Sequence, residues 1–227
     1  MAATKIVILG AGGPGRDVLD IIRDINRKND QDIYDLVGFL DNDPEKKGEL
    51  IDGLEVLGPV PDAEKLDDEI KFVNTIGGPS YFYKLPDIIG ESGLEDHRFE
   101  TIVHPDAFIA DTVVLGHGTV VFPKSSIYAG TEVGKHVMIK DARIGHNTSV
   151  GDYTSIQGKS MVAGEIGYCC YIGMNSTVRA QTAVGDRALV GMGAVVVDDV
   201  PSETVVAGVP AENMHKSVDK DDKYSDF

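Results

Sequence analysis

A branched aliphatic residue returns at about every sixth position between Val103 and Pro201. A six-residue period does not keep side chains on one face of a helix, and β-branched residues at these sites further disfavour helix. A hexapeptide period is typical of a parallel β-helix, in which each unit is one short strand and one corner, and each coil buries its neighbour. The recurring residues form three series: Val103, Ile109, Leu115, Val121, Ile127, Val133 and Ile139; then Ile144, Val150, Ile156 and Val162; then Ile166, Ile172, Val178, Val184, Val190 and Val196.

The period is interrupted twice. Ile139 and Ile144 are five positions apart, and Val162 and Ile166 are four apart. A shortened corner re-aims the chain, and irregularities of this kind in β structure often lie beside active sites. His146 lies between the two interruptions, which makes it a candidate functional residue.

The first hundred residues predict a different architecture. The apolar run Lys5–Leu9 is expected to form a buried strand that leads into a glycine-rich turn and a helix ending near Asn29. This arrangement binds phosphate, because glycines let the ligand approach the backbone and helix N–H groups face the anion. Further strands are expected at Val37–Leu40 and Ile70–Ile76. The candidate substrate-binding residues are Gly12, Gly13, Pro14, Gly15, Arg16, Asp41, Asn42, Gly77 and Gly78.

The length of this first part limits its ligand. A complete dinucleotide fold has two βαβαβ halves, and there is room for only one. A mononucleotide or nucleotide sugar is therefore favoured over NAD, with Asp41 placed to accept ribose hydroxyls. Two alternatives remain: a tight strand-to-helix turn without a ligand, and Asp41 as an ordinary loop carboxylate.

Composition excludes some functions. A formal net charge of −16 and a pI of about 4.6 argue against nucleic-acid binding, which requires a basic surface. No apolar run approaches the length of a membrane span, and the N-terminus lacks the pattern of a signal peptide. The two cysteines are adjacent and fit a reduced, cytoplasmic protein. The predicted divisions are an α/β half-Rossmann domain (1–100), an all-β solenoid (101–212) and a mobile acidic tail (213–227).

Two further motifs flank the solenoid, Ile-Val-His-Pro at 102–105 and Gly-Val-Pro-Ala at 208–211. With the glycine loop and the hexapeptide repeat, their order resembles the family of sialic-acid O-acetyltransferases and nucleotide-amino-sugar N-acetyltransferases. The resemblance covers nearly the whole chain except the tail. It implies a left-handed β-helix, a homotrimer and acetyl-CoA bound in the groove between neighbouring subunits.

The family's catalytic histidine lies in an Ile-Gly-His or Ile-Glu-His segment, to which Ile144-Gly145-His146 is similar. The resemblance therefore implies that His146 is the general base and that the Gly164 N–H lies near the thioester carbonyl. Asn147 stands where the family usually has an acid; it can orient the ring but cannot offset the positive charge of the imidazolium. Asp141 and Asp152 are the alternative sources of a negative charge. His104, His117 and His136 are expected at the surface or at a subunit interface. The resemblance places acetyl-CoA against Gly164, Ile172, Gly173, Arg179, Gly191, Gly193 and Pro210.

Two further departures from the family affect ligand binding. Pro14 stands where a histidine near the sugar is common, and Glu212 stands where a basic residue is common, which removes one contact to CoA phosphate. Arg179 and Arg187 are alternative phosphate contacts. No metal is expected, because β-helical carbonic anhydrases share only the repeat and their closely spaced histidine pair is missing.

The sequence therefore predicts an acetyl-CoA-dependent N-acetyltransferase acting on a nucleotide-linked amino sugar. One alternative is O-acetylation of sialic acid or a related sugar. The other is a non-catalytic protein that senses a nucleotide sugar or assists assembly, which Asn147 and Glu212 motivate.

Overall fold

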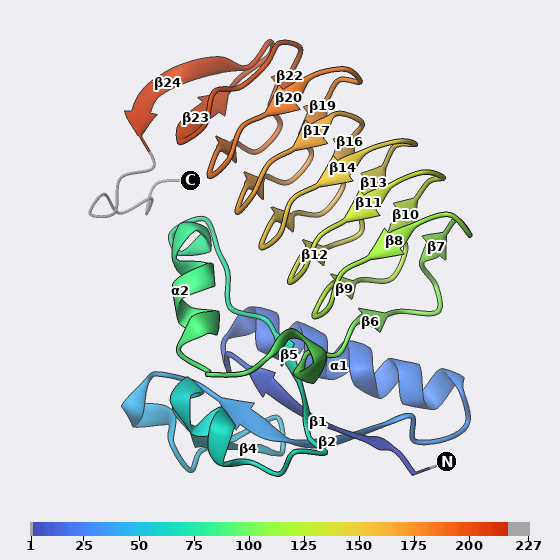
Figure 1. Ribbon diagram of the computed structural model, residues 1–227, viewed down its shortest axis with the longest axis vertical. Helices are drawn as coiled ribbons and strands as arrows, with labels where there is room; N and C mark the ends of the chain where they lie inside the picture. Colours follow the sequence, from blue (N-terminus) through green and yellow to red (C-terminus); the bar gives the residue numbers. More distant parts are fainter. Residues whose placement is uncertain (1, 218–227) are drawn as a thin grey trace.

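The computed structural model describes residues 2–217 and contains two domains, with the solenoid stacked on the half-Rossmann unit (Figure 1). The first domain holds a five-stranded sheet in the order β3-β4-β2-β1-β5. Its three predicted strands are present and mutually parallel, and β4 adds a fourth parallel strand. The strands are β1 (Thr4–Leu9), β2 (Tyr34–Leu40), β3 (Leu50–Ile51), β4 (Leu54–Gly58) and β5 (Lys71–Asn74).

The β3–β4 hairpin was not expected from the sequence. Leu50 is 72% exposed, and β4 alternates buried and exposed residues over only five positions, so this segment has little of the apolar continuity that marks β1. The hairpin extends the sheet beyond β2, because β4 supplies the edge pairing that β2 would otherwise lack.

Successive side chains of β1 point to opposite faces of the sheet, and both sets are apolar, so a helix covers each face. Ile6 and Ile8 pack with the buried face of the long helix α1, whereas Val7 and Leu9 pack with the short helix α2. This sandwich is the predicted half-Rossmann unit. The helices are α1 (Gly13–Lys28) and α2 (Leu85–Gly90), with 3-10 turns at η1 (Pro44–Lys46), η2 (Val60–Lys65), η3 (Phe82–Lys84) and η4 (Asp96–Arg98).

The solenoid is a parallel β-helix with three faces, and each recurring aliphatic residue is the second residue of a two-residue strand. The first face contains β6 (Ile102–Val103), β9 (Val120–Val121), β12 (Met138–Ile139), β15 (Ser155–Ile156), β18 (Tyr171–Ile172) and β21 (Leu189–Val190). The second face contains β7 (Phe108–Ile109), β10 (Ser126–Ile127), β13 (Arg143–Ile144), β16 (Met161–Val162), β19 (Thr177–Val178) and β22 (Val195–Val196). The third face contains β8 (Val114–Leu115), β11 (Glu132–Val133), β14 (Ser149–Val150), β17 (Glu165–Ile166) and β20 (Ala183–Val184). The predicted fold class, a half-Rossmann domain followed by a left-handed β-helix, is confirmed.

Strand register is kept through both interruptions of the repeat. Ile127 pairs with Ile144 across the five-residue step, and Val150 pairs with Ile166 across the four-residue step. The missing residues are therefore removed from corners and not from strands. The five-residue step shortens a corner between the first and second faces, and the four-residue step shortens one between the second and third faces.

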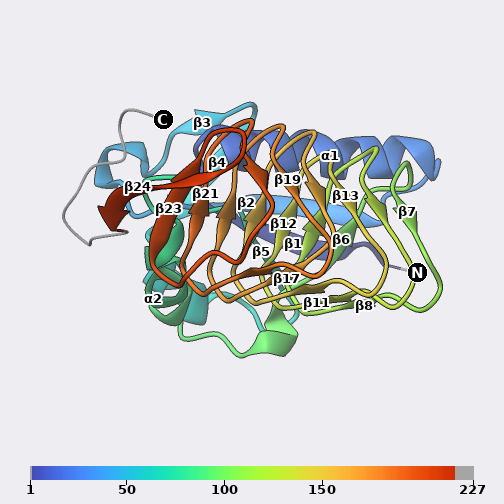
Figure 2. The same cartoon turned by 90° about the horizontal axis from the view of Figure 1, so that it is seen from above.

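The first face of the solenoid carries the first domain. Its outward residues Val120, Tyr171 and Leu189 pack against that domain, and Phe82 is inserted beside Tyr171 with ring centroids 5.9 Å apart. On the other two faces the outward residues are exposed or half-buried, and Val114 is 60% exposed. Seen from above, α1 runs along one edge of the coils and α2 lies at a different edge (Figure 2).

Two histidines expected at the surface or at a subunit interface are instead buried within one chain, where its two domains meet. His104 is 1% exposed, and its Nε2 lies 2.9 Å from a carboxylate oxygen of Asp24 on α1. His136 is 3% exposed and stacks on the ring of Tyr153, and burial lowers the pKa of His136 to about 4. The expectation was wrong for both because the first domain covers these corners. His117 is exposed, as predicted.

The last described segment corrects the predicted start of the tail. Residues 212–217 form β24 (Glu212–Ser217), which pairs antiparallel with β23 (Thr204–Ala207) at the end of the first face. The free edge of β23 supplies hydrogen-bonding groups that this charged segment can pair with, so low apolar content does not prevent strand formation. The rest of the predicted tail, 218–227, lies outside the described residues.

Candidate functional site

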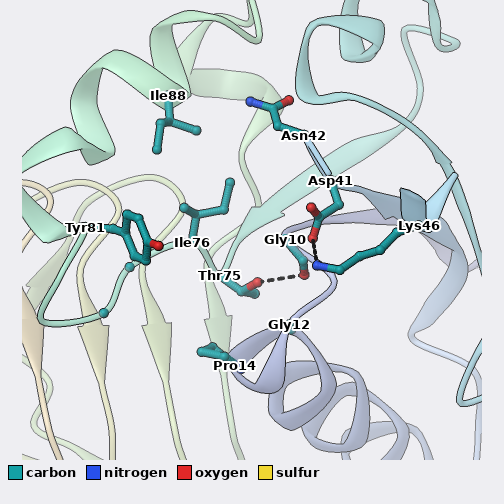
Figure 3. Close-up of a pocket in the computed structure, with 13 residues that line it drawn as sticks. Gly10, Gly12, Pro14, Asp41, Asn42, Lys46, Thr75, Ile76, Tyr81 and Ile88 are labelled. Atoms are coloured by element: carbon teal, nitrogen blue, oxygen red, sulfur yellow. Dashed lines mark hydrogen bonds and ion pairs between the residues drawn. The ribbon is translucent and has the colours of Figure 1, made fainter. Parts of the chain in front are cut away.

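Two hollows contain the predicted functional residues. The first, here called the glycine-loop cavity, has a volume of about 370 Å³ and lies at the carboxyl ends of β1, β2 and β5 (Figure 3). Ligands of open α/β sheets bind at this edge, where the loops after parallel strands meet. The cavity is lined by Gly10, Gly12, Pro14, Gly15, Asp41, Asn42, Lys46, Thr75, Ile76, Gly77, Gly78, Tyr81 and Ile88.

The glycine loop is tightly folded onto the start of α1. A Cβ on Gly15 would lie 2.0 Å from the backbone oxygen of Gly10, so no side chain fits there without moving the backbone. Gly10 itself has φ of +96°, a conformation that favours glycine. The Thr75 hydroxyl, from the end of β5, lies 2.7 Å from the Leu9 carbonyl and 3.1 Å from that of Gly10, and therefore holds the loop against the sheet.

Asp41 joins the loop to the end of β2. Its carboxylate accepts hydrogen bonds from the N–H groups of Ala11 (2.8 Å) and Asp43 (2.9 Å), and from Lys46 Nζ (3.0 Å). Burial acts to raise the pKa of Asp41, but these three donors together outweigh burial and lower the pKa. Asp41 therefore already holds the loop in place, whatever it contributes to a ribose. Lys46, which the sequence analysis missed, is the cation of this cavity (Figure 3).

Most of the predicted substrate-binding residues line this cavity, but Gly13 and Arg16 do not. The side chain of Arg16 points to Asp52, with Nε 2.7 Å from a carboxylate oxygen. This ion pair engages the guanidinium away from the cavity. The other predicted residues, namely Gly12, Pro14, Gly15, Asp41, Asn42, Gly77 and Gly78, are brought together.

The second hollow, here called the corner notch, has a volume of about 570 Å³ and lies where the second and third faces of the solenoid meet. In the coil that contains His146, four residues separate Ile144 from β14, whereas in the next coil only Ala163 and Gly164 separate Val162 from β17. The shortened corner leaves a gap between the longer corners below and above it. The notch is lined by His146, Asn147, Ala163, Gly164, Glu165, Ala180, Gln181, Thr182, Ala183 and Asp199.

His146 lies at the lower rim of the notch and is exposed. Its Nδ1 lies 3.2 Å from Nδ2 of Asn147, which itself adopts a left-handed conformation with φ of +54°. Among residues 2–217, no other hydrogen bond or ion pair involves this ring, so Nε2 is available to a ligand.

Gly164 forms the floor of the notch. A Cβ there would lie 2.2 Å from the Thr182 carbonyl oxygen, so the shortened corner requires glycine. The amides on either side, of Ala163 and Glu165, pair with carbonyls of the next coil, whereas the Gly164 N–H has no acceptor within the described chain. A free amide beside an imidazole is the arrangement that acyl transfer requires of an oxyanion site.

The two acids suggested as substitutes for an acidic neighbour of His146 lie elsewhere. Asp141 is on a corner between the first and second faces and forms an ion pair with Lys159. Asp152 is on a corner between the third and first faces and accepts a hydrogen bond of 2.8 Å from the Lys135 N–H. Neither lines the notch, so this expectation was wrong; residues close in sequence occupy different corners of the solenoid.

The predicted acetyl-CoA contacts fall into separate groups. Gly164 lines the notch, and Arg179 lies at the start of the corner that forms its upper side. Gly173, Gly191 and Gly193 lie at corners between the first and second faces, and Pro210, which follows a cis peptide bond, lies between β23 and β24. A single chain does not bring these groups together. The side chain of Ile172 is fully buried in the solenoid core, so only its backbone could contact a cofactor.

Residues 2–217 contain neither a cluster of metal ligands nor a membrane-spanning helix. No group of three or more His, Cys, Asp or Glu side chains within 2–217 is arranged to hold a metal ion. In the same range, no helix is long and apolar enough to cross a bilayer.

Comparison with protein families identifies the first domain. Residues 5–81 match the PglD N-terminal domain family. Among curated proteins, the chain is 29% identical over 123 residues to the bifunctional protein GlmU of Streptococcus agalactiae, a match that covers 45% of this chain and 27% of GlmU. The chain therefore spans less than a third of the length of this relative.

Comparison with solved structures covers nearly the whole chain. The acetyltransferase domain of PglB from Neisseria gonorrhoeae, also solved in complex with acetyl coenzyme A, is 26% identical, with a TM-score of 0.79 over 93% of this chain and 100% of the domain. PerB from Caulobacter crescentus, solved with CoA and GDP-perosamine, has the same fold at 24% identity, with a TM-score of 0.77 over 93% of this chain and 98% of PerB. The resemblance predicted from the sequence is confirmed by the match of residues 5–81 and by the similarity to the PglB acetyltransferase domain.

Proposed function

We propose that this protein transfers an acetyl group from acetyl-CoA to the amine of a nucleotide-linked amino sugar. The observation that carries the proposal is the corner notch, where one shortened corner opens a hollow beside an imidazole whose Nε2 is unengaged and beside an unengaged backbone N–H. The similarity to a PglB domain solved with acetyl coenzyme A supports the donor. The glycine-loop cavity is the site proposed for the nucleotide, with Lys46 facing its phosphates.

The proposed reaction needs no covalent enzyme intermediate. Nε2 of His146 takes a proton from the amine as the amine attacks the thioester carbon, a role suited to imidazole because it ordinarily titrates near neutral pH. The C–S bond then breaks, and the imidazolium returns the proton to the departing thiolate. The N–H of Gly164 donates to the oxyanion of the tetrahedral intermediate.

Asn147 sets the tautomer that this role requires. For Nε2 to act as a base, Nδ1 must carry the hydrogen and donate it to an oxygen. A half-turn of the Asn147 amide, which exchanges Nδ2 and Oδ1, places that acceptor at the observed 3.2 Å separation. Asn147 therefore orients the ring in the proposed mechanism without adding charge.

The notch favours an amine over sialic acid as the acceptor. Its charged side chains, apart from the histidine itself, are the carboxylates of Glu165 and Asp199. An amino sugar brings an ammonium group, which these carboxylates attract, whereas sialic acid brings a carboxylate, which they repel. This charge balance is the reason for preferring N-acetylation to the alternative of O-acetylation.

A homotrimer would complete the donor site. The proposed CoA contacts occupy two different corners of one solenoid, and a neighbouring copy related by a threefold axis could bring its first-to-second-face corner to the notch. The expected molecular mass in sedimentation equilibrium is therefore three times that of the chain. Turnover of acetyl-CoA by a monomeric protein would contradict the proposal that a second copy completes the donor site.

The test of the proposed function is thiol release from acetyl-CoA in the presence of a panel of nucleotide amino sugars. The chain's own thiols do not interfere, because burial raises the pKa of both Cys169 and Cys170 to about 12. His146→Ala is expected to lower kcat by roughly 100-fold or more, the usual contribution of a positioned base. The matched control is His117→Ala, which removes an exposed histidine from another corner of the solenoid.

Two results would contradict the proposal. Undiminished turnover in His146→Ala would remove this residue as the base. Nucleotide binding without acetyl-CoA binding, measured by titration calorimetry of the wild-type protein, would favour the non-catalytic alternative.

A further inference from the structure

The proposed mechanism leaves the acidic side of the corner notch without a role. Two carboxylates line it, and neither was predicted from the sequence. Asp199 is engaged, because one of its oxygens accepts a hydrogen bond of 2.8 Å from the Ala183 N–H. Glu165 is exposed, and its carboxylate forms no hydrogen bond or ion pair within residues 2–217.

The shortened corner determines what surrounds Glu165, whose own place is fixed by strand register. In a corner of full length, several turn residues separate the preceding strand from the next one, but here Glu165 follows Gly164 directly and begins β17. It pairs with Ser149 of the coil below, in whose corner His146 lies. Removal of two residues therefore brings a carboxylate next to the proposed oxyanion site.

We propose that Glu165 is the acceptor-selecting residue of this site, which binds the ammonium form of the sugar amine and discriminates it from a hydroxyl. The bound ammonium loses one proton to water before the neutral amine attacks, and His146 takes the second proton during the attack. This inference rests on the proposed function. The attacking nitrogen must lie between Nε2 of His146 and a thioester carbon held near Gly164, and Glu165 is the unengaged acid beside that position. A carboxylate forms strong, charge-assisted hydrogen bonds to an ammonium group, and a neutral hydroxyl offers only the weaker kind.

The other residues around the notch do not offer an ammonium group a partner equal to Glu165. Asn147 is neutral, and Arg143 is a cation whose guanidinium donates to the Tyr128 hydroxyl at 2.8 Å. Arg179 adds a second positive charge at the upper corner. Glu132 also belongs to the third face, but it lies one coil below His146 and does not line the notch.

The experiment measures binding of matched sugar pairs to wild-type protein and to Glu165→Gln, both saturated with CoA. Each pair contains a nucleotide amino sugar and the same sugar with a hydroxyl at that carbon; GDP-perosamine and GDP-rhamnose form the first pair. Wild type is expected to bind the amino member about tenfold more tightly in at least one pair, and Glu165→Gln is expected to bind both members about equally. Glu165→Asp, which keeps the charge, should restore part of the preference.

The control is Glu132→Gln, which removes one negative charge from the same face outside the notch. It is expected to keep the wild-type preference, so equal losses in the two variants would show a general charge effect and overturn the proposal. Wild type without preference in any pair would overturn it as well.

Steady-state kinetics of thiol release distinguish a failure of this inference from a failure of the proposed function. Glu165→Gln should raise KM for the amino sugar about tenfold and leave KM for acetyl-CoA unchanged. A fall in kcat with binding unaltered would show that Glu165 acts through His146 and would contradict acceptor selection. Failure of the wild type to release thiol, with the amine preference intact, would count against the proposed chemistry and not against Glu165 as the amine-binding residue.

Discussion

The glycine-loop cavity and the corner notch are constructed by opposite means. The first is enclosed by additional bonds within one domain, since Asp41 and Thr75 hold the loop after β1 and Lys46 bonds to Asp41. The second exists because residues are missing from one corner of a repeat, and its side chains have few partners. The first hollow is suited to hold a ligand rigidly. The second is an open surface that the proposed reaction completes with a second subunit.

This difference predicts that substitutions in the glycine-loop cavity lower the stability of the fold, whereas substitutions in the corner notch lower mainly the enzymatic activity.

The largest effect is expected for Gly15→Ala. The new Cβ would meet the Gly10 carbonyl oxygen at 2.0 Å, so either the loop or the start of α1 must move. We expect a loss of roughly 3 kcal/mol in the free energy of unfolding, as for other overpacked sites, and loss of nucleotide binding. Urea unfolding and calorimetry measure these quantities. Gly13→Ala is the control, because no atom lies within 4 Å of its added Cβ; equal losses in both variants would show that the close approach is unimportant.

Gly164→Ala should act on catalysis more than on folding. Its Cβ would lie 2.2 Å from the Thr182 carbonyl oxygen, so the corner must shift and carry the N–H away from the reacting carbonyl. Loss of one oxyanion donor typically lowers kcat by about 100-fold. Nucleotide binding should be unchanged, and thiol release measures the effect. Gly158→Ala, at a corner with room for the methyl group, should behave as wild type. Normal turnover in Gly164→Ala would exclude this amide as the oxyanion donor.

A smaller effect is expected for Asp41→Asn. The folded-state pKa of Asp41 is lowered, so its carboxylate contributes stability above its unfolded pKa of about 4 and loses that contribution as pH falls through the folded value. At pH 7 the variant should lose about 1 kcal/mol in the free energy of unfolding, and the difference from wild type should shrink towards zero in strong acid. Urea unfolding between pH 7 and pH 3 tests this; a difference that grows in acid would contradict it.

The smallest expected effect concerns the cysteines. Burial raises the pKa of Cys169 and of Cys170 to about 12, so native protein at pH 8 should react negligibly with a thiol reagent, and both residues should react after unfolding. Rapid labelling of native protein would show that the segment packed on the first face, where the Phe82 carbonyl accepts from Cys169, opens readily.

Much of the fold followed from the sequence, because inward residues of a solenoid recur at a fixed period. Val162 and Ile166 were identified as recurring residues although only four positions separate them, and both occupy their expected places in strands. The β3–β4 hairpin was missed because Leu50 and its neighbours give no comparable pattern.

The site was harder to predict, since its neighbours come from different coils. Asp141 and Asp152 are near His146 in sequence but occupy other corners, whereas Glu165 and Asp199 share its corner. Counting three recurring aliphatic residues per coil would have identified both, because Ile144, Val162 and Val196 precede the same corner in different coils. Lys46 gave no such signal, as its position depends on the fold of η1 and on its bond to Asp41.

The shortened corner at Ala163–Gly164 has a consequence for how such proteins could diverge. Strand register on both sides of this corner is independent of its length, so an insertion of two residues would restore the regular period and leave the interior columns intact. The same insertion would occupy the space in front of His146. A single short insertion in a gene could therefore abolish the activity of a descendant and leave it fully folded. Corner length, more than the presence of the histidine, is then the feature that distinguishes active from inactive descendants of this architecture.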